Sequence, residues 1–147
     1  YYVVWWQNDG EQIKESSLQT GHHYQQYSDD LKFKPLVTWS RITTGMPAFR
    51  YKNSGYLSDM AGFCLYSTNT DLRYVVAFCN SSVAAYYLQI LAPTLNIMTG
   101  QVLALPVCTS ADNDNHILSF AESCVDLAKN NWDSFENSWG FKRNPLV

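Results

Sequence analysis

The sequence of 147 residues lacks the short motifs with which many enzymes bind cofactors or attack substrates. It contains no GxGxxG dinucleotide-binding motif, no GxxxxGK[ST] phosphate loop, no GxSxG nucleophile motif and no HExxH zinc motif. The acidic pair Asp29-Asp30 fits a solvated turn better than a catalytic carboxylate pair. We therefore predict that this chain is not itself a catalyst.

Cysteine and histidine are sparse and do not form a metal-binding pattern. The four cysteines have no CxxC spacing, and the three histidines lack a partner at ligand spacing. Each cysteine lies in an apolar context. We interpret them as reduced, buried thiols of a cytoplasmic protein, in preference to disulfides or a metal site: Cys64, Cys79, Cys108 and Cys124.

No hydrophobic run is long enough to cross a membrane, because the most apolar stretch, residues 75–97, is interrupted by polar residues and a proline. Hydrophobic residues make up 46% and aromatic residues 15% of the chain, which fits one folded domain with a core. The sequence starts at Tyr1 without a methionine, a basic segment or a cleavage site. We interpret it as a piece of a longer polypeptide.

Acidic residues are absent from one stretch of an otherwise acidic chain. The net charge is −3, yet residues 31–58 hold no acid and five bases, Lys32, Lys34, Arg41, Arg50 and Lys52. An acidic body with one basic stripe binds a phosphate backbone locally without adhering to every polyanion. On charge alone, a chance cluster remains the competing explanation.

The first half of the chain predicts strands, because β-branched and aromatic residues dominate its apolar runs. We expect strands at 1–7, 36–42, 48–51 and 61–66, with turns at Asn8-Asp9-Gly10 and at 43–47. Residues 11–34 are polar and predict an irregular connection with about one helical turn.

From residue 70 the spacing of apolar residues becomes helical. We expect a helix from Asp71 capped by Thr70, a second from Ser81 or Ser82, and a third from Asp114. Their predicted apolar faces are Leu72, Val75, Val76 and Cys79; Val83, Tyr86, Tyr87 and Ile90; and Ile117, Phe120, Ala121, Cys124, Leu127 and Ala128.

A short strand at 101–105 completes the prediction. The expected architecture is one α+β domain over residues 1–130, with a mixed β-sheet packed by helices. An aromatic and charged tail, residues 131–147, follows it. We expect Trp132, Phe135, Trp139 and Phe141 to dock against another part of a longer protein, which leaves them partly exposed in this chain.

Three blocks of sequence carry a family resemblance: TWSRITTGMPAFRYKNSGYLSDMAG from Thr38, LRYVVAFCNSSVAAYYLQILAPTLNIMTGQVLALPV from Leu72, and NNWDSFENSWGFKRNPLV from Asn130. In this order and spacing they resemble the C-terminal region of the adenine-specific DNA methyltransferases of BREX/Pgl phage-resistance systems (PglX-like enzymes). The start, YVVxWxNDGE, is similar to a strand of that family that follows a Gly-Gly-Glu-Phe-Arg-Lys-Trp block, which is missing here. The middle block also resembles target-recognition domains of type I specificity subunits and of bifunctional restriction–modification enzymes.

The resemblance implies a division of labour within the longer polypeptide. An upstream domain binds S-adenosylmethionine and methylates N6 of an adenine flipped out of the duplex, and a downstream domain reads the target sequence. This chain has neither a cofactor motif nor the Asn/Asp-Pro-Pro-Tyr/Phe tetrapeptide of the catalytic domain. The resemblance therefore assigns it the reading role, with no cofactor of its own. The implied partners are double-stranded DNA, the methyltransferase domain and other proteins of the defence system.

The candidate DNA-binding residues lie in and around TWSRITTGMPAFRY, residues 38–51. Arg41 and Arg50 are expected to read bases, because a guanidinium group pairs with O6 and N7 of guanine. Lysines contact phosphates, and hydroxyls or glycine allow close approach of the backbone; these predicted contacts are Lys32, Lys34, Lys52, Ser40, Thr43, Thr44 and Gly45. Surface arginines held in ion pairs are the competing interpretation.

Two other functions remain open. The chain is a protein–protein scaffold within the same defence complex if the basic stripe is incidental, or a carbohydrate-binding module if its aromatic residues form a platform. The predicted reduced thiols argue against the second. DNA reading requires the five basic side chains to share a face, whereas a scaffold requires a hydrophobic patch. We expect Trp39, Phe49 and Tyr51 to lie in the core and not to stack on bases.

Overall fold

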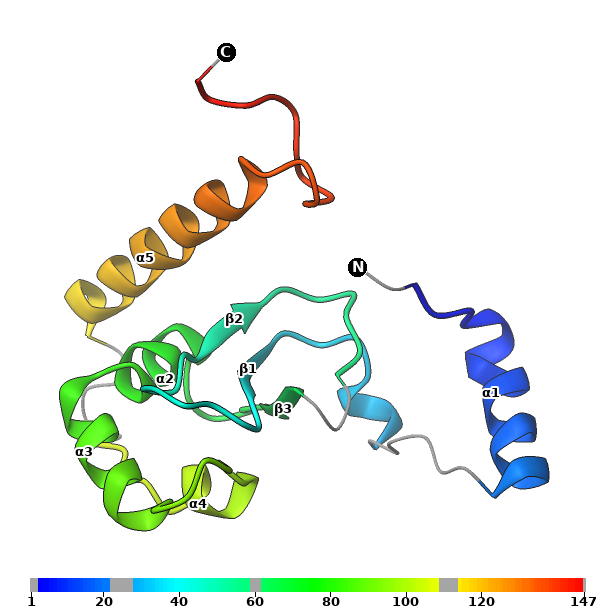
Figure 1. Cartoon of the computed structure of the whole chain (residues 1–147), viewed down its shortest axis with the longest axis horizontal. Helices are drawn as coiled ribbons and strands as arrows, with labels where there is room; N and C mark the ends of the chain where they lie inside the picture. Colours follow the sequence, from blue (N-terminus) through cyan, green and yellow to red (C-terminus); the bar gives the residue numbers. More distant parts are fainter. Residues whose placement is uncertain (1–2, 22–27, 59–61, 109–113, 147) are drawn as a thin grey trace.

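The computed structural model describes residues 3–21, 28–58, 62–108 and 114–146, and it confirms an α+β fold (Figure 1). A small antiparallel sheet lies at the centre, with helices packed against it. In chain order, the elements are α1 (Gln7–Thr20), the short 3-10 helix η1 (Asp29–Leu31), β1 (Leu36–Ser40), β2 (Arg50–Lys52), β3 (Gly62–Leu65), α2 (Leu72–Cys79), α3 (Ser82–Leu91), α4 (Thr99–Leu103) and α5 (Asn115–Asp133).

The sheet has the strand order β2-β1-β3. The predicted hairpin is confirmed, since β1 pairs with β2 through Val37 opposite Tyr51. On its other edge, β1 pairs with β3, where Trp39 lies opposite Phe63. Both pairings are antiparallel, so the prediction of a mixed sheet is wrong for the described residues. Of the two segments expected to extend the sheet, 1–7 and 101–105, the described residues 3–7 and 101–105 form no strand.

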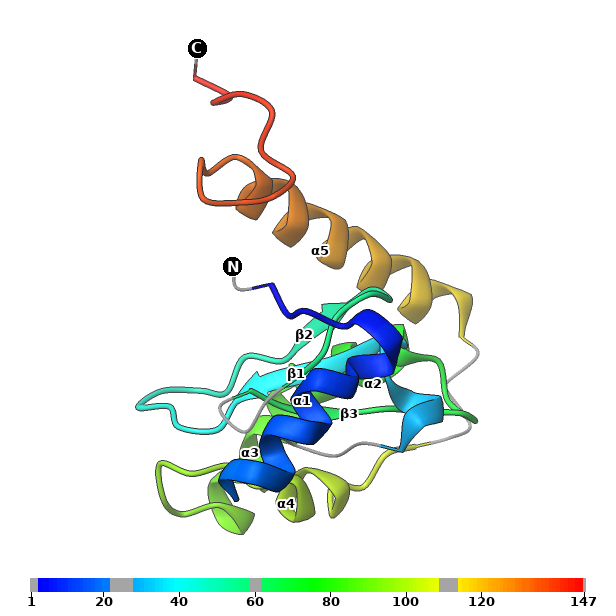
Figure 2. The same ribbon diagram turned by 90° about the vertical axis from the view of Figure 1, so that its right-hand side faces the viewer.

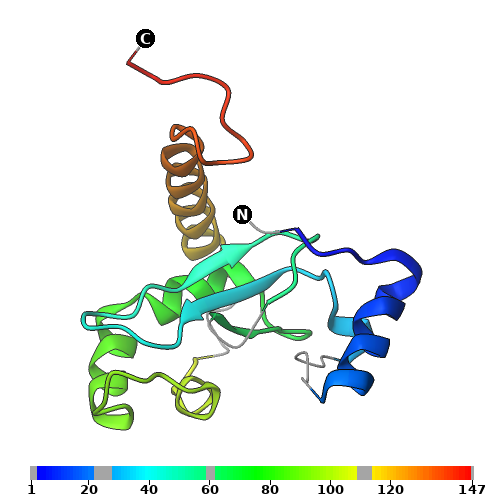
Figure 3. The same cartoon turned by 45° about the vertical axis from the view of Figure 1, so that its right-hand side comes forward.

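The N-terminal segment is a helix where a strand and an irregular connection were predicted. Residues 11–20 are rich in Glu, Gln, Lys and Leu, which favour helix when no neighbouring strand is available for pairing. The predicted turn is present as three left-handed residues, Asn8, Asp9 and Gly10, with φ of 52°, 55° and 73°. Trp6 anchors this end by an edge-on contact with Phe33, while the rest of α1 stands apart from the sheet (Figures 1 and 3).

The segment predicted as a strand at 101–105 forms no strand, and its first three residues are the end of α4. Val102 in α4 and Leu105, two residues beyond its end, are both buried, and Leu105 N donates to Val102 O (3.2 Å). Gln101 closes the start of α4, because its side chain accepts a hydrogen bond from Met98 N (2.8 Å) and donates one to Leu91 O (3.0 Å). The order of apolar and polar residues along the sequence does not reveal these hydrogen bonds.

The predicted helices after residue 70 are present, and polar caps set their starts. Asp71 caps α2 one residue later than the expected Thr70, and its side chain accepts from Arg73 N. Ser81 caps α3 and Asp114 caps α5, as predicted. α2 and α3 meet at a bend of 67°; among the described residues no single helix has the length and apolar character to cross a membrane, and only this bent pair reaches that threshold together.

The hydrophobic core lies between the sheet and α2, α3 and α4. Trp39 is fully buried, contacts Phe49 at 5.4 Å between ring centroids, and donates from Nε1 to Ile97 O (3.0 Å). The apolar face of α2 packs against this centre, with Val75, Val76 and Cys79 buried. The predicted core positions of Trp39 and Phe49 are confirmed, and Tyr51 packs at the edge of the core.

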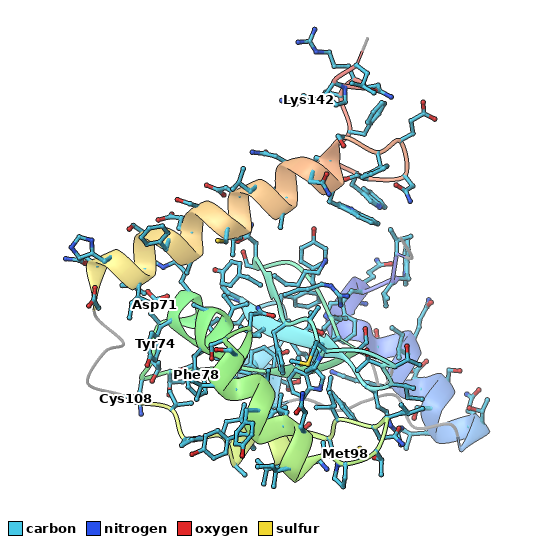
Figure 4. The ribbon with its side chains drawn as sticks, turned by 60° about the vertical axis from the view of Figure 1, so that its left-hand side comes forward. Asp71, Tyr74, Phe78, Met98, Cys108 and Lys142 are labelled. Atoms are coloured by element: carbon cyan, nitrogen blue, oxygen red, sulfur yellow. The ribbon has the colours of Figure 1, made fainter. Side chains whose placement is uncertain are left out.

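The outer helix α5 packs on α2 and continues through the predicted boundary at residue 130 (Figure 4). Of its predicted apolar face only Ala121 is buried, while Phe120 and Leu127 are 73% and 69% exposed. Beyond α5, Ser138 donates to the Asp133 carboxylate (2.6 Å), which folds the tail back on the helix end. The expected exposure of the tail aromatics is confirmed for Trp132, Phe135 and Trp139.

The four cysteines are free, but most are not buried. Cys79 lies in the core, where burial raises the pKa of its thiol to about 11. Cys64 is half-buried, and Cys108 and Cys124 are exposed. The prediction of uniformly buried thiols is therefore wrong, because Cys124 lies on the exposed face of α5.

Candidate nucleic-acid interface

Arg50 and Lys52 lie on the face of the sheet opposite to that of Val37; Arg50 is exposed there, whereas Lys52 lies opposite Leu36, which is 1% exposed. Directly opposed residues of antiparallel strands share a face, and Arg50 lies opposite Thr38 whereas Tyr51 lies opposite the buried Val37. The alternation therefore turns Arg50 and Lys52 away from Val37. Ser40, exposed at the end of β1, has the same parity as Thr38.

The electrostatics of this pair favour an incoming anion. Lys52 is half-buried, with Nζ 5.2 Å from the centroid of the Tyr56 ring. Burial and, to a lesser degree, the charge of Arg50 lower the pKa of Lys52 below its ordinary value of 10.5. In the part of the chain that the structure describes, Arg50 makes no ion pair. The competing interpretation of a surface arginine held by an acid therefore finds no support for Arg50 among the described residues.

Arg41 lies on the opposite face from Arg50. It follows Trp39 by two residues, and its guanidinium carbon is 5.7 Å from the centroid of the Phe63 ring on the core side. Its Nε is buried and has no hydrogen-bond partner among the described residues. A buried donor without a partner raises the free energy of the folded state. A hydrogen bond to Arg41 Nε would therefore stabilise the protein more than the same bond at an exposed site.

The loop that joins β1 and β2 projects from the sheet and is held at its base (Figure 2). Thr43 N donates to Leu95 O (3.0 Å), and Ile42 forms an isolated bridge with Asn96. Thr44 and Gly45 are exposed, and the Thr43 hydroxyl lies 3.3 Å from Gly45 N. The predicted tip therefore presents a hydroxyl and a glycine backbone to solvent on a supported base.

The structure places Lys32 inside the molecule and not on the predicted surface. Its side chain is 5% exposed, forms an ion pair with Asp29, and lies with Nζ 5.1 Å from the centroid of the Trp6 ring. A phosphate contact would require Lys32 to leave this pair. Lys34, by contrast, is exposed. The pKa of Asp30 is lowered mainly by the hydrogen bond from Ser28, and the charge of Lys34 is a smaller cause in the same direction.

The five predicted basic residues thus do not share one face, so the condition that the sequence set for DNA reading by all five is not met. The structure brings together Arg50, Lys52 and Ser40, sets Arg41 on the other side of the same hairpin, and encloses Lys32. Sequence reasoning missed Tyr56, which carries the Lys52 ammonium over its ring. Its only signal was an aromatic residue four positions after a lysine, a spacing that has no fixed meaning outside a helix.

The half-buried Arg73 is held in ion pairs within the fold. It pairs with Asp71 at 2.6 Å and with Glu122 of α5 at 3.4 Å. The hydrogen bond from Arg73 lowers the pKa of Asp71 below its ordinary value of 3.8, and that of Arg73 is raised in turn. This site joins α2 to α5, whereas Arg50 of the hairpin has no ion pair among the described residues.

Comparison with known proteins gives this arrangement its context. No protein-family model matches the chain. Over its whole length it is 34% identical to "Adenine-specific methyltransferase PglX" of Lacticaseibacillus casei (strain Zhang), and over 99% of its length it is 28% identical to "Adenine-specific methyltransferase BrxX" of Escherichia coli O9:H4 (strain HS). The chain is homologous to one part of these adenine-specific methyltransferases. It spans 12% of the length of each.

Proposed function

We propose that the chain is the target-recognition part of an adenine-specific DNA methyltransferase of a BREX/Pgl phage-defence system. In this proposal a separate domain of the longer protein binds S-adenosylmethionine and transfers the methyl group, in the cytoplasm. The homology to PglX and BrxX supports the methyltransferase context. The lack of cofactor and catalytic motifs supports a reading role for this segment.

The observation that carries the proposal is the exposed Arg50, which has no ion pair among the described residues, beside Lys52 on the same face of the hairpin. DNA affinity comes largely from cations that neutralise phosphates, and sequence is read by side chains that reach base edges. The major groove admits a two-stranded β-ribbon. A hairpin that enters the groove by its projecting loop contacts DNA from both faces, so Arg50 and Arg41 do not need to share one.

In this arrangement each residue has a distinct role. Arg50 and Arg41 form bidentate contacts, to guanine edges or to phosphates, and Arg41 does so through the part of its guanidinium group that is not buried. Lys52 and Lys34 contact phosphates. Ser40 and the tip residues Thr43, Thr44 and Gly45 contribute hydroxyls and close backbone approach.

A second candidate function is a protein-binding scaffold in the same defence complex. It is favoured by the bulky apolar side chains that α3 and α5 leave exposed, including Tyr86, Ile90 and Phe120. The scaffold function predicts that the hairpin arginines have no influence on the methylated sequence. The two functions therefore differ in one measurable outcome.

The deciding experiment is methylation of a randomised DNA library by the full-length methyltransferase and its variants. Arg50→Ala and Arg41→Ala are each expected to cost about 1–3 kcal/mol at the cognate site and to relax one base position. Arg73→Ala is the matched control, because its partners are Asp71 and Glu122. It should leave the methylated motif unchanged. If both hairpin variants keep the wild-type motif and rate, the scaffold function takes precedence.

A further inference from the structure

A long segment of the chain has no charged side chain. Residues 74–111 contain neither an acid nor a base, and they include α3 and α4. A surface without charges is unusual for an exposed helix, since solvated helix faces normally carry Lys, Glu or Arg. It is also unsuited to DNA, whose phosphates are met by cations. The surface of α3 therefore needs an explanation separate from the hairpin.

The structure turns the bulky side of α3 outward. Ala84 and Leu88 fill the core, whereas the opposite face carries Val83, Tyr86, Tyr87 and Ile90, which are 53%, 64%, 40% and 60% exposed. These four residues, the α3 face, follow the i, i+3, i+4, i+7 spacing of a single helix side. The sequence predicted this side as core, and the structure contradicts that prediction.

We propose that the α3 face is a docking surface for another domain of the same methyltransferase polypeptide. The inference rests on the proposed function in so far as it places the chain within a longer protein. In both PglX and BrxX the homologous segment is 12% of the polypeptide, so most of each chain lies outside it. A contiguous aromatic and aliphatic face is a surface that protein partners cover.

A domain of the same polypeptide is favoured over a second copy of the chain by effective concentration. A covalently joined domain is present near its binding surface at about millimolar concentration, which exceeds that of a free partner. The α3 face also carries no charge of the kind that fixes register between separate partners. The occupant that this surface fits is therefore an apolar, uncharged face of a neighbouring domain.

Hydroxyl-radical footprinting tests this directly, because tyrosine side chains are oxidised according to their exposure. In the folded full-length methyltransferase, Tyr86 and Tyr87 are expected to be oxidised at least fivefold more slowly than in the urea-unfolded protein. Trp39, fully buried within the chain, provides the protected reference. Oxidation of Tyr86 at the unfolded rate in the folded protein overturns the proposal. Protection that disappears on dilution identifies a second copy as the occupant and overturns it too.

A variant arm separates docking from folding. Tyr86→Asp with Ile90→Asp places charge on the α3 face without touching the core, and Leu18→Asp, on the 86% exposed Leu18 of α1, is the control. We expect the double variant to lower the Tm of the full-length protein and to raise oxidation of Tyr87 severalfold, with no change for Leu18→Asp. Equal behaviour of the two variants overturns the proposal. DNA reading is scored by the methylated motif and is independent of this result.

Discussion

At the scale of single residues, the hairpin cations differ in their surroundings more than the sequence indicates. Arg50 is exposed and has no ion pair among the described residues, Lys52 is half-buried over an aromatic ring, and Lys32 is buried in a pair with the exposed Asp29. These differences imply unequal contributions to binding. Lys52 is already partly desolvated, so a phosphate contact at this position costs little further loss of hydration.

Replacement of Lys52 by Ala is expected to weaken DNA binding about equally for all sequences. Loss of one phosphate contact should reduce the slope of log K against log salt by roughly one unit, because one fewer counterion is released. Binding of the full-length protein to cognate and random duplexes at several salt concentrations measures this slope. Lys142→Ala, on the tail beyond α5, should leave it unchanged (Figure 4). A change confined to the cognate duplex would contradict a phosphate role.

The Asp71–Arg73 pair predicts a pH dependence of stability. The folded-state pKa of Asp71 lies below its ordinary value of 3.8, so the pair stabilises the fold at pH above 3.8 and loses this effect as pH falls through the folded pKa. Chemical unfolding of the wild type and of Arg73→Gln should therefore show a difference in stability at pH 7 that narrows below pH of about 4. A difference that stays constant down to the acid transition would refute the linkage.

At the scale of elements, Asn80 connects a helix to the hairpin. It follows α2, and its side chain accepts from Phe49 N (3.0 Å) and donates to Phe49 O (2.9 Å). The side chain also donates to Val76 O in the last turn of α2. The side-chain amide of Asn80 therefore hydrogen-bonds the last turn of α2. It also bonds both backbone groups of Phe49, the residue just before β2, as a paired strand would.

Asn80→Ala is expected to destabilise the fold by about 1–3 kcal/mol, because it leaves the backbone groups of the buried Phe49 without partners. Urea unfolding followed by tryptophan fluorescence reports the change, since Trp39 packs against Phe49. The matched control is Asn130→Ala, at an exposed position of α5, with an effect within about 0.5 kcal/mol. Equal stability of both variants would show that Asn80 has no bridging role.

At the scale of the whole molecule, the chain divides its surface into two kinds of region. The hairpin presents cations and hydroxyls, whereas α3 presents an uncharged apolar face on a different element. Under the proposed function, the hairpin would face DNA and the α3 face would meet the rest of the longer protein.

The isolated chain is expected neither to bind S-adenosylmethionine nor to methylate DNA, since it carries no cofactor loop and no catalytic tetrapeptide. Titration calorimetry of the folded chain should give no saturable heat with S-adenosylmethionine, while the full-length enzyme should give a stoichiometric one. Circular dichroism of the same sample establishes that the chain is folded. Saturable binding to the 147-residue chain would mean that a cofactor site was missed.

Local signals were sufficient for part of the fold. Ser81 and Asp114 stand at helix starts because a side-chain oxygen there satisfies a free backbone N–H, a chemistry that depends on neighbours in sequence. The β1–β2 hairpin was predictable for the same reason, from two apolar runs around a Gly-Met-Pro turn. The basic character of this hairpin was also predictable, since charge follows directly from the amino-acid composition.

Tertiary structure decided which sides of these elements meet the core. α3 has apolar residues on both sides, so the spacing in its sequence does not tell whether Leu88 or Tyr86 is buried. The packing of α3 against α2 and α4 buries Leu88 and leaves Tyr86 exposed. Strand pairing likewise sets Arg41 and Arg50 on opposite faces, and the lack of a partner strand lets residues 7–20 form a helix. Sequence determines which side chains can share a face, whereas the choice of face depends on contacts between segments far apart in the chain.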